Sequence, residues 1–218
     1  MKVCTDACLF GALIPEIEKE ECHVLDIGTG TGLLSLMLAQ RSPVALIDAI
    51  EIDEEAAEQA KENFKASPWK DRLNLIHADL LNFELQHKYD LIISNPPFFE
   101  GDLLSDDHKK NSAKHDCSLT LEQLLGRANN LLADDGMFCV LLPYHRVEYF
   151  ENLALQYDFY LEQKISVRQT PKHDYFRGVL FFRKEKTELT VDEIVIKGGD
   201  GEYSEWFAAL LSAYYLKL

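Results

Sequence analysis

The stretch His23-Val24-Leu25-Asp26-Ile27-Gly28-Thr29-Gly30-Thr31-Gly32 decides the fold class of this chain. Its first five residues have the apolar character of a buried strand, and the three glycines that follow favour a tight turn. An apolar helical pattern begins directly after the turn and runs from Leu33 to Arg41. A strand, a glycine-rich turn and a helix in this order predict one unit of a parallel α/β sheet, with a ligand at the turn.

Apolar runs and helical patterns alternate along the rest of the chain, which is typical of a parallel sheet with crossover helices. We expect further strands at 44–50, 73–77, 89–94, 136–142, 159–167, 175–183 and 189–196, and helices at 54–64, 119–132, 145–156 and 203–216. The runs 159–167 and 175–183 have the alternation that allows antiparallel pairing. The polar stretch 100–118 lacks periodicity, and we interpret it as a long loop over the site. With no repeat or composition break, residues 1–218 are predicted to form one domain.

Composition excludes several classes of function. No apolar run approaches the roughly 20 residues of a membrane span, and no signal peptide is recognisable, so we expect a cytoplasmic protein without a membrane partner. The five cysteines are scattered and odd in number, which favours reduced, mostly buried thiols over a zinc site, and no metal is expected. The net charge of −15 repels phosphate at long range, so an RNA substrate would require a local basic patch.

The glycine-rich turn does not match the common nucleotide-binding motifs. A dinucleotide-binding turn requires a third glycine at position 33, which is Leu33, and a P-loop requires a lysine after Gly32. Glycines let the backbone approach a ligand closely, and the following helix offers free amides to an anion. We therefore expect a weak anion, such as the carboxylate of S-adenosylmethionine.

Acidic residues at successive strand ends support a site for S-adenosylmethionine. Glu51 closes the second strand, where a carboxylate can accept both ribose hydroxyls. Asp79 is placed to accept from the adenine amine, and Asp26 would face the methionine ammonium. Alternatively, Asp26 and Asp79 only cap neighbouring helices. The cofactor contacts predicted in this part of the chain are Asp26, Gly28, Thr29, Gly30, Gly32, Glu51, Ile52, Asp79, Leu80 and Asn95.

The run Asn95-Pro96-Pro97-Phe98 follows the apolar stretch 89–94 and is the predicted catalytic motif. An exocyclic amine on a heteroaromatic ring is a poor nucleophile because its lone pair is shared with the ring. The Asn95 oxygen and the Pro96 carbonyl can accept its two hydrogens, and proline brings no competing N–H. Phe98 can stack on the base, and a flipped nucleotide could reach this pocket. The alternative is that Asn-Pro-Pro only forms a turn.

With these residues in place, the chain resembles the class I methyltransferases that modify amino groups, and within them the bacterial valine-tRNA adenine-N6 methyltransferases. The opening segment 1–12 and the closing residues 203–207 and 214–216 resemble family segments, although Cys4 stands where glycine is usual. The resemblance implies a Rossmann-like fold with a mostly parallel seven-stranded sheet and helices on both faces. It also implies a cofactor-covering segment at 1–20, a C-terminal strand and helix at 189–218, and cofactor contacts by Lys2, Thr5 and Asp6.

The resemblance implies S-adenosylmethionine-dependent methylation of the N6 amine of an adenine in tRNA. Two basic stretches are candidates for gripping the RNA phosphates, namely Lys109, Lys110 and Lys114, and Arg168, Lys172 and Arg177. Three alternatives stay open at this point: a guanine amine of ribosomal RNA, a protein glutamine amide, and a catalytically silent binding module. Phe98 in place of tyrosine favours a nucleobase over a glutamine amide, whereas the acidic surface would suit a basic protein substrate.

Overall fold

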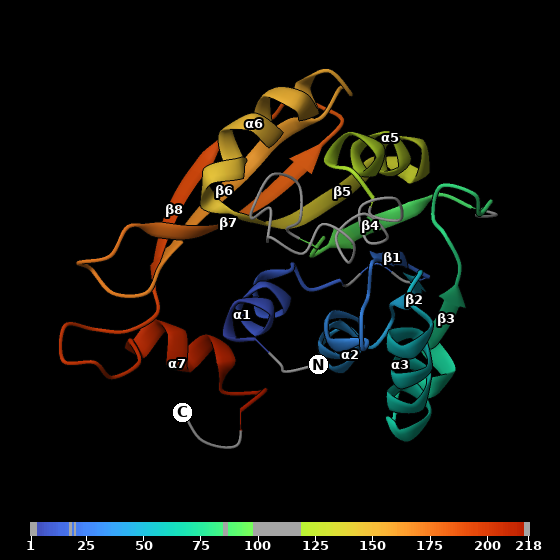
Figure 1. The fold of residues 1–218 in the computed structure, drawn as a ribbon, viewed down its shortest axis with the longest axis horizontal. Helices are drawn as coiled ribbons and strands as arrows, with labels where there is room; N and C mark the ends of the chain where they lie inside the picture. The colour runs from blue at the N-terminus through green and yellow to red at the C-terminus, as the bar shows by residue number, and fades with distance from the viewer. Residues whose placement is uncertain (1–3, 18, 20, 85–86, 98–118, 216–218) are drawn as a thin grey trace, which may run out of the picture.

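The computed structural model describes residues 4–17, 19, 21–84, 87–97 and 119–215, and within them one eight-stranded sheet forms the centre of the molecule (Figure 1). The strand order is β3-β2-β1-β4-β5-β7-β6-β8. The strands are β1 (His23–Ile27), β2 (Leu46–Glu51), β3 (Leu73–His77), β4 (Tyr89–Ser94), β5 (Leu132–Pro143), β6 (Tyr160–Arg168), β7 (Tyr175–Arg183) and β8 (Thr190–Val195).

Strand β7 alone runs against its neighbours, β5 and β6, and all other adjacent strands are parallel. The predicted α/β class, the mostly parallel sheet and the antiparallel pairing of β6 with β7 are therefore confirmed. The described sheet has one strand more than the seven expected from the resemblance. The additional strand is β8, which extends the sheet by pairing in parallel with β6, Ile194 lying opposite Val167.

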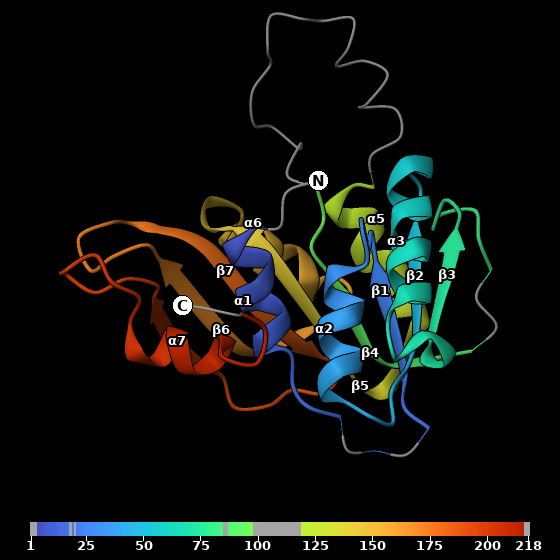
Figure 2. The ribbon, with the colours of Figure 1, turned by 90° about the horizontal axis from the view of Figure 1, so that it is seen from below.

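Helices cover both faces of the sheet, as predicted (Figures 1 and 2). One face carries α1 (Thr5–Leu13), α2 (Leu33–Arg41), α3 (Glu54–Ala66) and α7 (Glu205–Leu211), and the other carries α5 (Leu121–Leu131) and α6 (Tyr144–Leu155). A short 3-10 helix, η1 (Lys70–Arg72), precedes β3.

Most predicted bounds agree with the structure within two or three residues, with two larger differences. Strand β5 begins at Leu132, four residues before the predicted start, because Tyr89 pairs with Leu132 before the register shifts. Helix α7 ends at Leu211 instead of residue 216. It starts after Ser204, whose side chain accepts a hydrogen bond from the Phe207 amide and so fixes the first turn.

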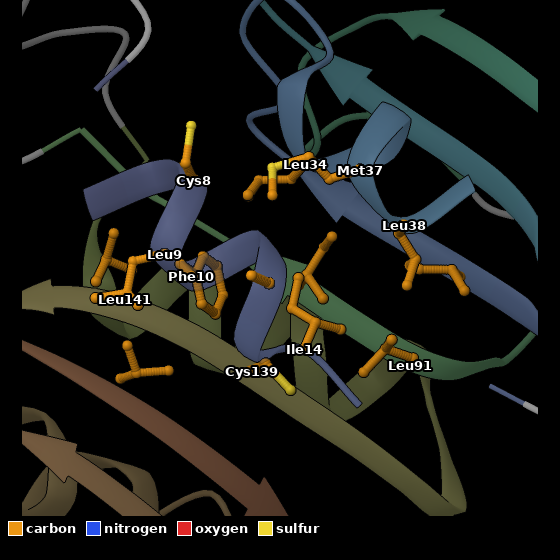
Figure 3. Close-up of a cluster of buried hydrophobic side chains, with 14 of the residues drawn as sticks. Cys8, Leu9, Phe10, Ile14, Leu34, Met37, Leu38, Leu91, Cys139 and Leu141 are labelled. Carbon is orange, nitrogen blue, oxygen red and sulfur yellow. The ribbon is translucent and has the colours of Figure 1, made fainter. Parts of the chain in front are cut away.

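Each face of the sheet has its own apolar core, which lies between the strands and the helices that cover them. The first contains α1, α2 and α7, and Figure 3 shows Leu9, Phe10 and Ile14 of α1 lying over Cys139 and Leu141 of β5. The segment predicted to cover the cofactor is thus also a structural helix, because it buries several large side chains completely. The second core contains α5, α6 and a group of fully buried aromatic rings, which are Phe138, Phe150, Phe159 and Phe182.

Within the described part of the chain, no disulfide joins Cys4, Cys8, Cys22 and Cys139, and all but Cys4 are buried. Their reduced state stays a prediction. None of the described helices has both the length and the apolar character needed to cross a membrane.

Candidate active site

The carboxyl ends of β1, β2 and β4 lie side by side, because these strands are parallel and adjacent. Ile27 of β1 lies opposite Ile50 of β2 on one side and Ser94 of β4 on the other. The Ser94 hydroxyl also donates to the Ile27 carbonyl at 2.9 Å and is completely buried. This register places the glycine-rich turn between Glu51 and Asn95, so the predicted donor and acceptor sites share one edge of the sheet.

The turn is fixed by its backbone. The amides of Gly28 and Thr29 both donate to the Ile50 carbonyl, at 2.9 and 3.1 Å. Gly28, Gly30 and Gly32 have φ angles of +70°, +59° and +85°, values that side chains other than glycine rarely adopt. Helix α2 begins without a side-chain cap on its first turn, so its amino end is open toward the ligand expected at this turn.

Asp26 is the most deeply buried acid in the site. Its Oδ2 accepts hydrogen bonds from the Thr29 hydroxyl at 2.6 Å and the Ser35 hydroxyl at 2.7 Å, whereas Oδ1 has no hydrogen-bond partner among the described residues. Burial raises the pKa of Asp26 to about 6, against the opposing effect of the two hydroxyls. The sequence reasoning missed Ser35, whose only signal is a polar residue within the apolar run 33–39.

Glu51 braces the turn. Its Oε2 accepts from the Gly30 amide at 2.8 Å, and its Oε1 accepts from the amides of Ile52 and Asp53, both at 2.9 Å. A carboxylate has about four acceptor positions, so one remains for a ligand. The structure therefore leaves room for one ribose hydroxyl, and the expectation that Glu51 accepts both requires the Gly30 bond to open. Ile52 is 46% exposed beside this carboxylate and offers an apolar surface.

Asp79 has local partners in the loop after β3. It accepts from the Leu81 amide at 2.9 Å and from the Asn82 side chain at 2.6 Å, an arrangement in which aspartate stabilises its own turn. This arrangement is closer to the capping alternative than to an adenine contact. The Leu80 side chain is buried in the second core, so only its backbone could face a cofactor.

The described part of the catalytic motif lies just beyond β4. The Asn95 Oδ1 atom is buried and has no hydrogen-bond partner among the described residues. Pro96 is buried and Pro97 is exposed, whereas Phe98 lies outside the described residues. A recess opens beside the prolines and is lined by Pro96, Pro97, Leu119, Leu121, Leu142, Pro143 and Arg146.

Two predicted site residues from opposite ends of the chain bind each other. Asp6, in the first turn of α1, forms an ion pair with Arg177 of β7 across 2.7 Å between Oδ2 and Nε. Both side chains are mostly buried, with 15% and 23% exposure. This pair anchors the start of α1 and neutralises Arg177, which makes Arg177 a poor phosphate ligand. Thr5 begins the same helix, and Lys2 lies outside the described residues.

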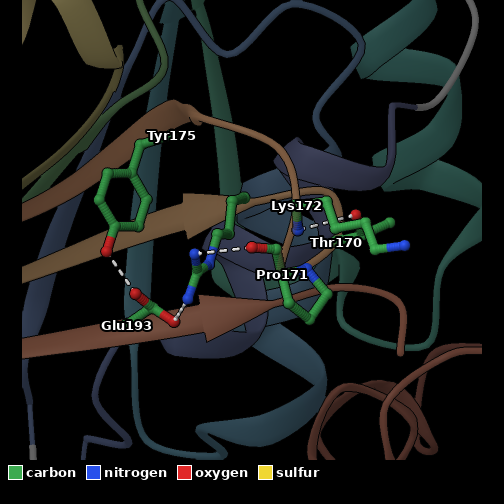
Figure 4. Close-up of polar contacts among 6 residues, drawn as sticks. Thr170, Pro171, Lys172, Tyr175 and Glu193 are labelled. Carbon is green, nitrogen blue, oxygen red and sulfur yellow. Dashed lines mark hydrogen bonds and ion pairs between the residues drawn. The ribbon is translucent and has the colours of Figure 1, made fainter. Parts of the chain in front are cut away.

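The other basic residues predicted to bind RNA differ in their surroundings. Arg168 forms an ion pair with Glu193, donates to the Pro171 carbonyl at 3.1 Å and lies over the Tyr175 ring. The Tyr175 hydroxyl also donates to Glu193 (Figure 4). These contacts tie β6, β7 and β8 together, so Arg168 has a structural role. Lys172 is exposed in the loop between β6 and β7. Lys109, Lys110, Lys114 and the loop predicted at 100–118 lie outside the described residues.

Three observations indicate that the described residues can bind S-adenosylmethionine. A Cβ added at Gly28 would meet no atom within 4 Å, so the turn leaves an open cradle. Asp26 Oδ1 is a buried acceptor without a partner near that cradle, as an ammonium group requires. Asn95 Oδ1 is a second such acceptor at the adjacent strand end. Among the described residues, no group of three or more His, Cys, Asp or Glu side chains could hold a metal ion.

The glycines of the turn provide a matched test of this cradle. We expect Gly32→Ala to lower the free energy of unfolding by about 2 to 4 kcal/mol, because its Cβ would lie 2.4 Å from Phe64 and its φ is +85°. Gly28→Ala meets no such contact and should cost about 1 kcal/mol, yet it should weaken S-adenosylmethionine binding because the methyl group enters the cradle. Urea unfolding and calorimetric titration measure the two effects. Equal cofactor affinity in Gly28→Ala and the unmodified chain would place the ligand elsewhere.

Comparisons with known proteins identify the family of this chain. The sequence model of the methyltransferase small domain matches residues 10–158. The chain is 44% identical to a tRNA1(Val) (adenine(37)-N6)-methyltransferase of Dyadobacter fermentans, covering 100% of this chain and 91% of the relative. It is 40% identical to the protein of the same name from Flavobacterium johnsoniae, covering 100% and 94%.

Solved structures show the same fold. A predicted O-methyltransferase of Agrobacterium tumefaciens superposes with a TM-score of 0.76 at 16% identity, covering 95% of each chain. A TehB-like SAM-dependent methyltransferase of Corynebacterium glutamicum has a TM-score of 0.57 at 19% identity, covering 84% of this chain and 89% of the other. At these identities the likeness concerns the fold.

Proposed function

We propose that this chain, which belongs to the methyltransferase small domain family, methylates the N6 amine of an adenine in tRNA. At about 40% identity over its whole length, it also belongs to the family of the tRNA1(Val) (adenine(37)-N6)-methyltransferases. The chain is an S-adenosylmethionine-dependent N-methyltransferase with a Rossmann-like fold. A tRNA substrate also accords with the cytoplasmic location expected from the sequence.

The unpartnered Asn95 oxygen is the structural observation that carries the proposal. A buried acceptor without a donor is costly, and such atoms persist where a ligand supplies the missing hydrogen bond. Asn95 follows β4 directly, and β4 lies in register with β1, so Asn95 and Gly28 follow the ends of adjacent strands. We infer that the missing donor is a group that meets the cofactor, as a methyl acceptor does.

The chemistry required of the protein is alignment. Bound S-adenosylmethionine supplies an electrophilic methyl group, and the reaction is an in-line displacement. Asn95 Oδ1 and the Pro96 carbonyl accept the two amine hydrogens, which turns the nitrogen lone pair toward the methyl group. Matched acceptors also stabilise the positive charge that develops on the amine. The amine becomes acidic as it is methylated, so it loses its proton without a strong general base.

The cofactor residues have separate roles in this proposal. Asp26 Oδ1 would accept a hydrogen bond from the ammonium group, Glu51 would accept one from a ribose hydroxyl, and the exposed Ile52 side chain would cover the adenine. The turn 28–32 approaches the ligand through its backbone. Thr5 and Asp6, in the first turn of α1, would cover the cofactor. The ion pair between Asp6 and Arg177 fixes the position of this turn against β7. We further infer that residues 1–218 act as one domain, since α1 and α7 share the core of α2.

Methyl transfer to defined substrates tests the proposal. The purified chain is incubated with S-adenosylmethionine carrying a deuterated methyl group and, separately, with unmodified tRNA, ribosomal RNA and ribosomal protein. We expect labelled N6-methyladenosine from tRNA in nucleoside mass spectrometry and background label in the other samples. Label in guanine of ribosomal RNA or in protein glutamine would contradict the proposed substrate. The absence of label from every sample, despite measurable cofactor binding, would favour a silent binding module.

A further inference from the structure

The recess beside the catalytic motif has an unusual lining. Of the described residues that line it, Arg146 is the one charged side chain, and the others are proline and leucine. The recess lies where β4 and β5 end and where α5 and α6 begin, so Arg146 shares it with Pro96 and Pro97. A group that binds here is adjacent to any base held by Asn95.

Arg146 is arranged together with an exposed aromatic ring. Its guanidinium carbon lies 4.8 Å from the centroid of the Tyr149 ring, one turn further along α6. Tyr149 is 52% exposed, which is high for a large aromatic side chain outside a binding surface. Stacking on Tyr149 restricts the guanidinium, so less conformational entropy is lost when it binds a ligand.

The start of α6 adds to the positive potential. Arg146 is the third residue of the helix, the N-cap Pro143 makes no side-chain hydrogen bond, and the first turn contains no acid. Amide groups at a helix amino end favour a negative ligand, and Arg146 supplies a full charge at the same place. The chain as a whole carries −15, so this position differs in sign from the average surface.

We propose that Arg146 and Tyr149 form the contact for the nucleotide next to the methylated adenine, an inference that rests on the proposed function. The Arg146 guanidinium binds the phosphate that flanks the flipped base, and the exposed Tyr149 ring stacks with the neighbouring base. Guanidinium groups match phosphate oxygens in two parallel hydrogen bonds, and aromatic rings bind unpaired bases without sequence preference. These residues therefore govern RNA affinity and leave the chemistry at Asn95 unchanged.

Four variants test the charge and the ring separately. Arg146→Gln removes the charge and Arg146→Lys keeps it without the planar fork, whereas Tyr149→Ala removes the ring and Tyr149→Phe keeps it. We expect the KM for tRNA to rise about tenfold in Arg146→Gln and Tyr149→Ala, less in Arg146→Lys, and little in Tyr149→Phe. The slope of log affinity against log salt should decrease by about one in Arg146→Gln only. Thermal unfolding and the KM for S-adenosylmethionine should stay unchanged in all four, which excludes misfolding.

Lys61→Gln is the matched control, because Lys61 is an exposed lysine on α3 that pairs with Glu58. It should change neither the KM for tRNA nor the salt slope. If the unmodified chain methylates tRNA and Arg146→Gln retains both the KM and the slope, the inference is overturned while the proposed function stands. If the unmodified chain methylates protein instead of RNA, both fail together.

Discussion

Asn95→Ala is expected to lower kcat for RNA methylation by about 10²- to 10³-fold, which is the typical cost of removing one group that stabilises developing charge. The lost oxygen is the buried Oδ1, which has no partner among the described residues and is free to accept an amine hydrogen. Without it, the amine lone pair is less well directed at the methyl group, while the cradle at Gly28 is intact. The KM for S-adenosylmethionine should therefore change less than threefold. Single-turnover methylation of tRNA at saturating enzyme measures the chemical step directly.

Two variants separate this role from local structure. Ser94→Ala removes the neighbouring buried hydroxyl that bonds to the Ile27 carbonyl, so it should lower the free energy of unfolding by about 1 kcal/mol and leave kcat within a fewfold of normal. Asn95→Asp keeps an acceptor of the same shape and should retain more activity than Asn95→Ala. Equal activity in Asn95→Ala and the unmodified chain would remove Asn95 from the reaction. A joint loss of kcat and stability in both alanine variants would assign it a structural role.

The backbone arrangement of this site was predictable because strand ends are visible in the sequence. Apolar runs ending at Ile27, near Glu51 and at Ser94 place three loops at one edge, provided that the sheet is parallel. The parallel order of β1, β2 and β3 follows from the helices α2 and α3 between them, since each crossover must return the chain to the same edge. A strand at 189–196 was predicted, but its pairing with β6 was not, because no helix lies between β7 and β8 to indicate which strand β8 joins.

Side-chain partners were much less predictable than strand ends. Asp6 and Arg177 were assigned separately to the cofactor and to RNA, yet they form one ion pair between α1 and β7. Their sequence separation carries no signal for that contact, which depends on how α1 packs on the sheet. Similarly, Arg168 belongs to a cluster with Glu193 and Tyr175 that a basic residue count cannot reveal. An arginine that is held in an internal ion pair, as Arg168 and Arg177 are, is a weaker candidate for a phosphate ligand than its charge alone indicates.

Asp26→Asn is expected to stabilise the ligand-free chain and to weaken S-adenosylmethionine binding, two effects of opposite sign. The native pKa of about 6 exceeds the ordinary aspartate value of 3.8, so the native state binds more protons than the unfolded state between about pH 4 and pH 6. The free energy of unfolding therefore falls as pH rises through this window and is lowest above it. There the ionised carboxylate lowers the free energy of unfolding by about 3 kcal/mol. Asparagine carries no charge, and its oxygen can keep the bonds from Thr29 and Ser35.

We expect Asp26→Asn to raise the free energy of unfolding at pH 7.5 by about 1 to 3 kcal/mol and to flatten its dependence on pH between 4 and 6. Cofactor affinity should fall about 10²-fold, because the buried ammonium would lose its opposite charge. Urea unfolding at several pH values and calorimetric titration provide both measurements.

Ser35→Ala is the matched control for Asp26→Asn, because it keeps the carboxylate and removes one of the two hydroxyls that stabilise its charge. The pKa of Asp26 should then rise further, so the ligand-free chain is less stable at pH 7.5 and cofactor binding begins at a higher pH. The two variants thus move stability in opposite directions although both alter the same carboxylate. A destabilised Asp26→Asn chain with normal cofactor affinity would show that Asp26 serves the turn alone. An affinity that falls while stability rises requires the charge itself to be the binding group.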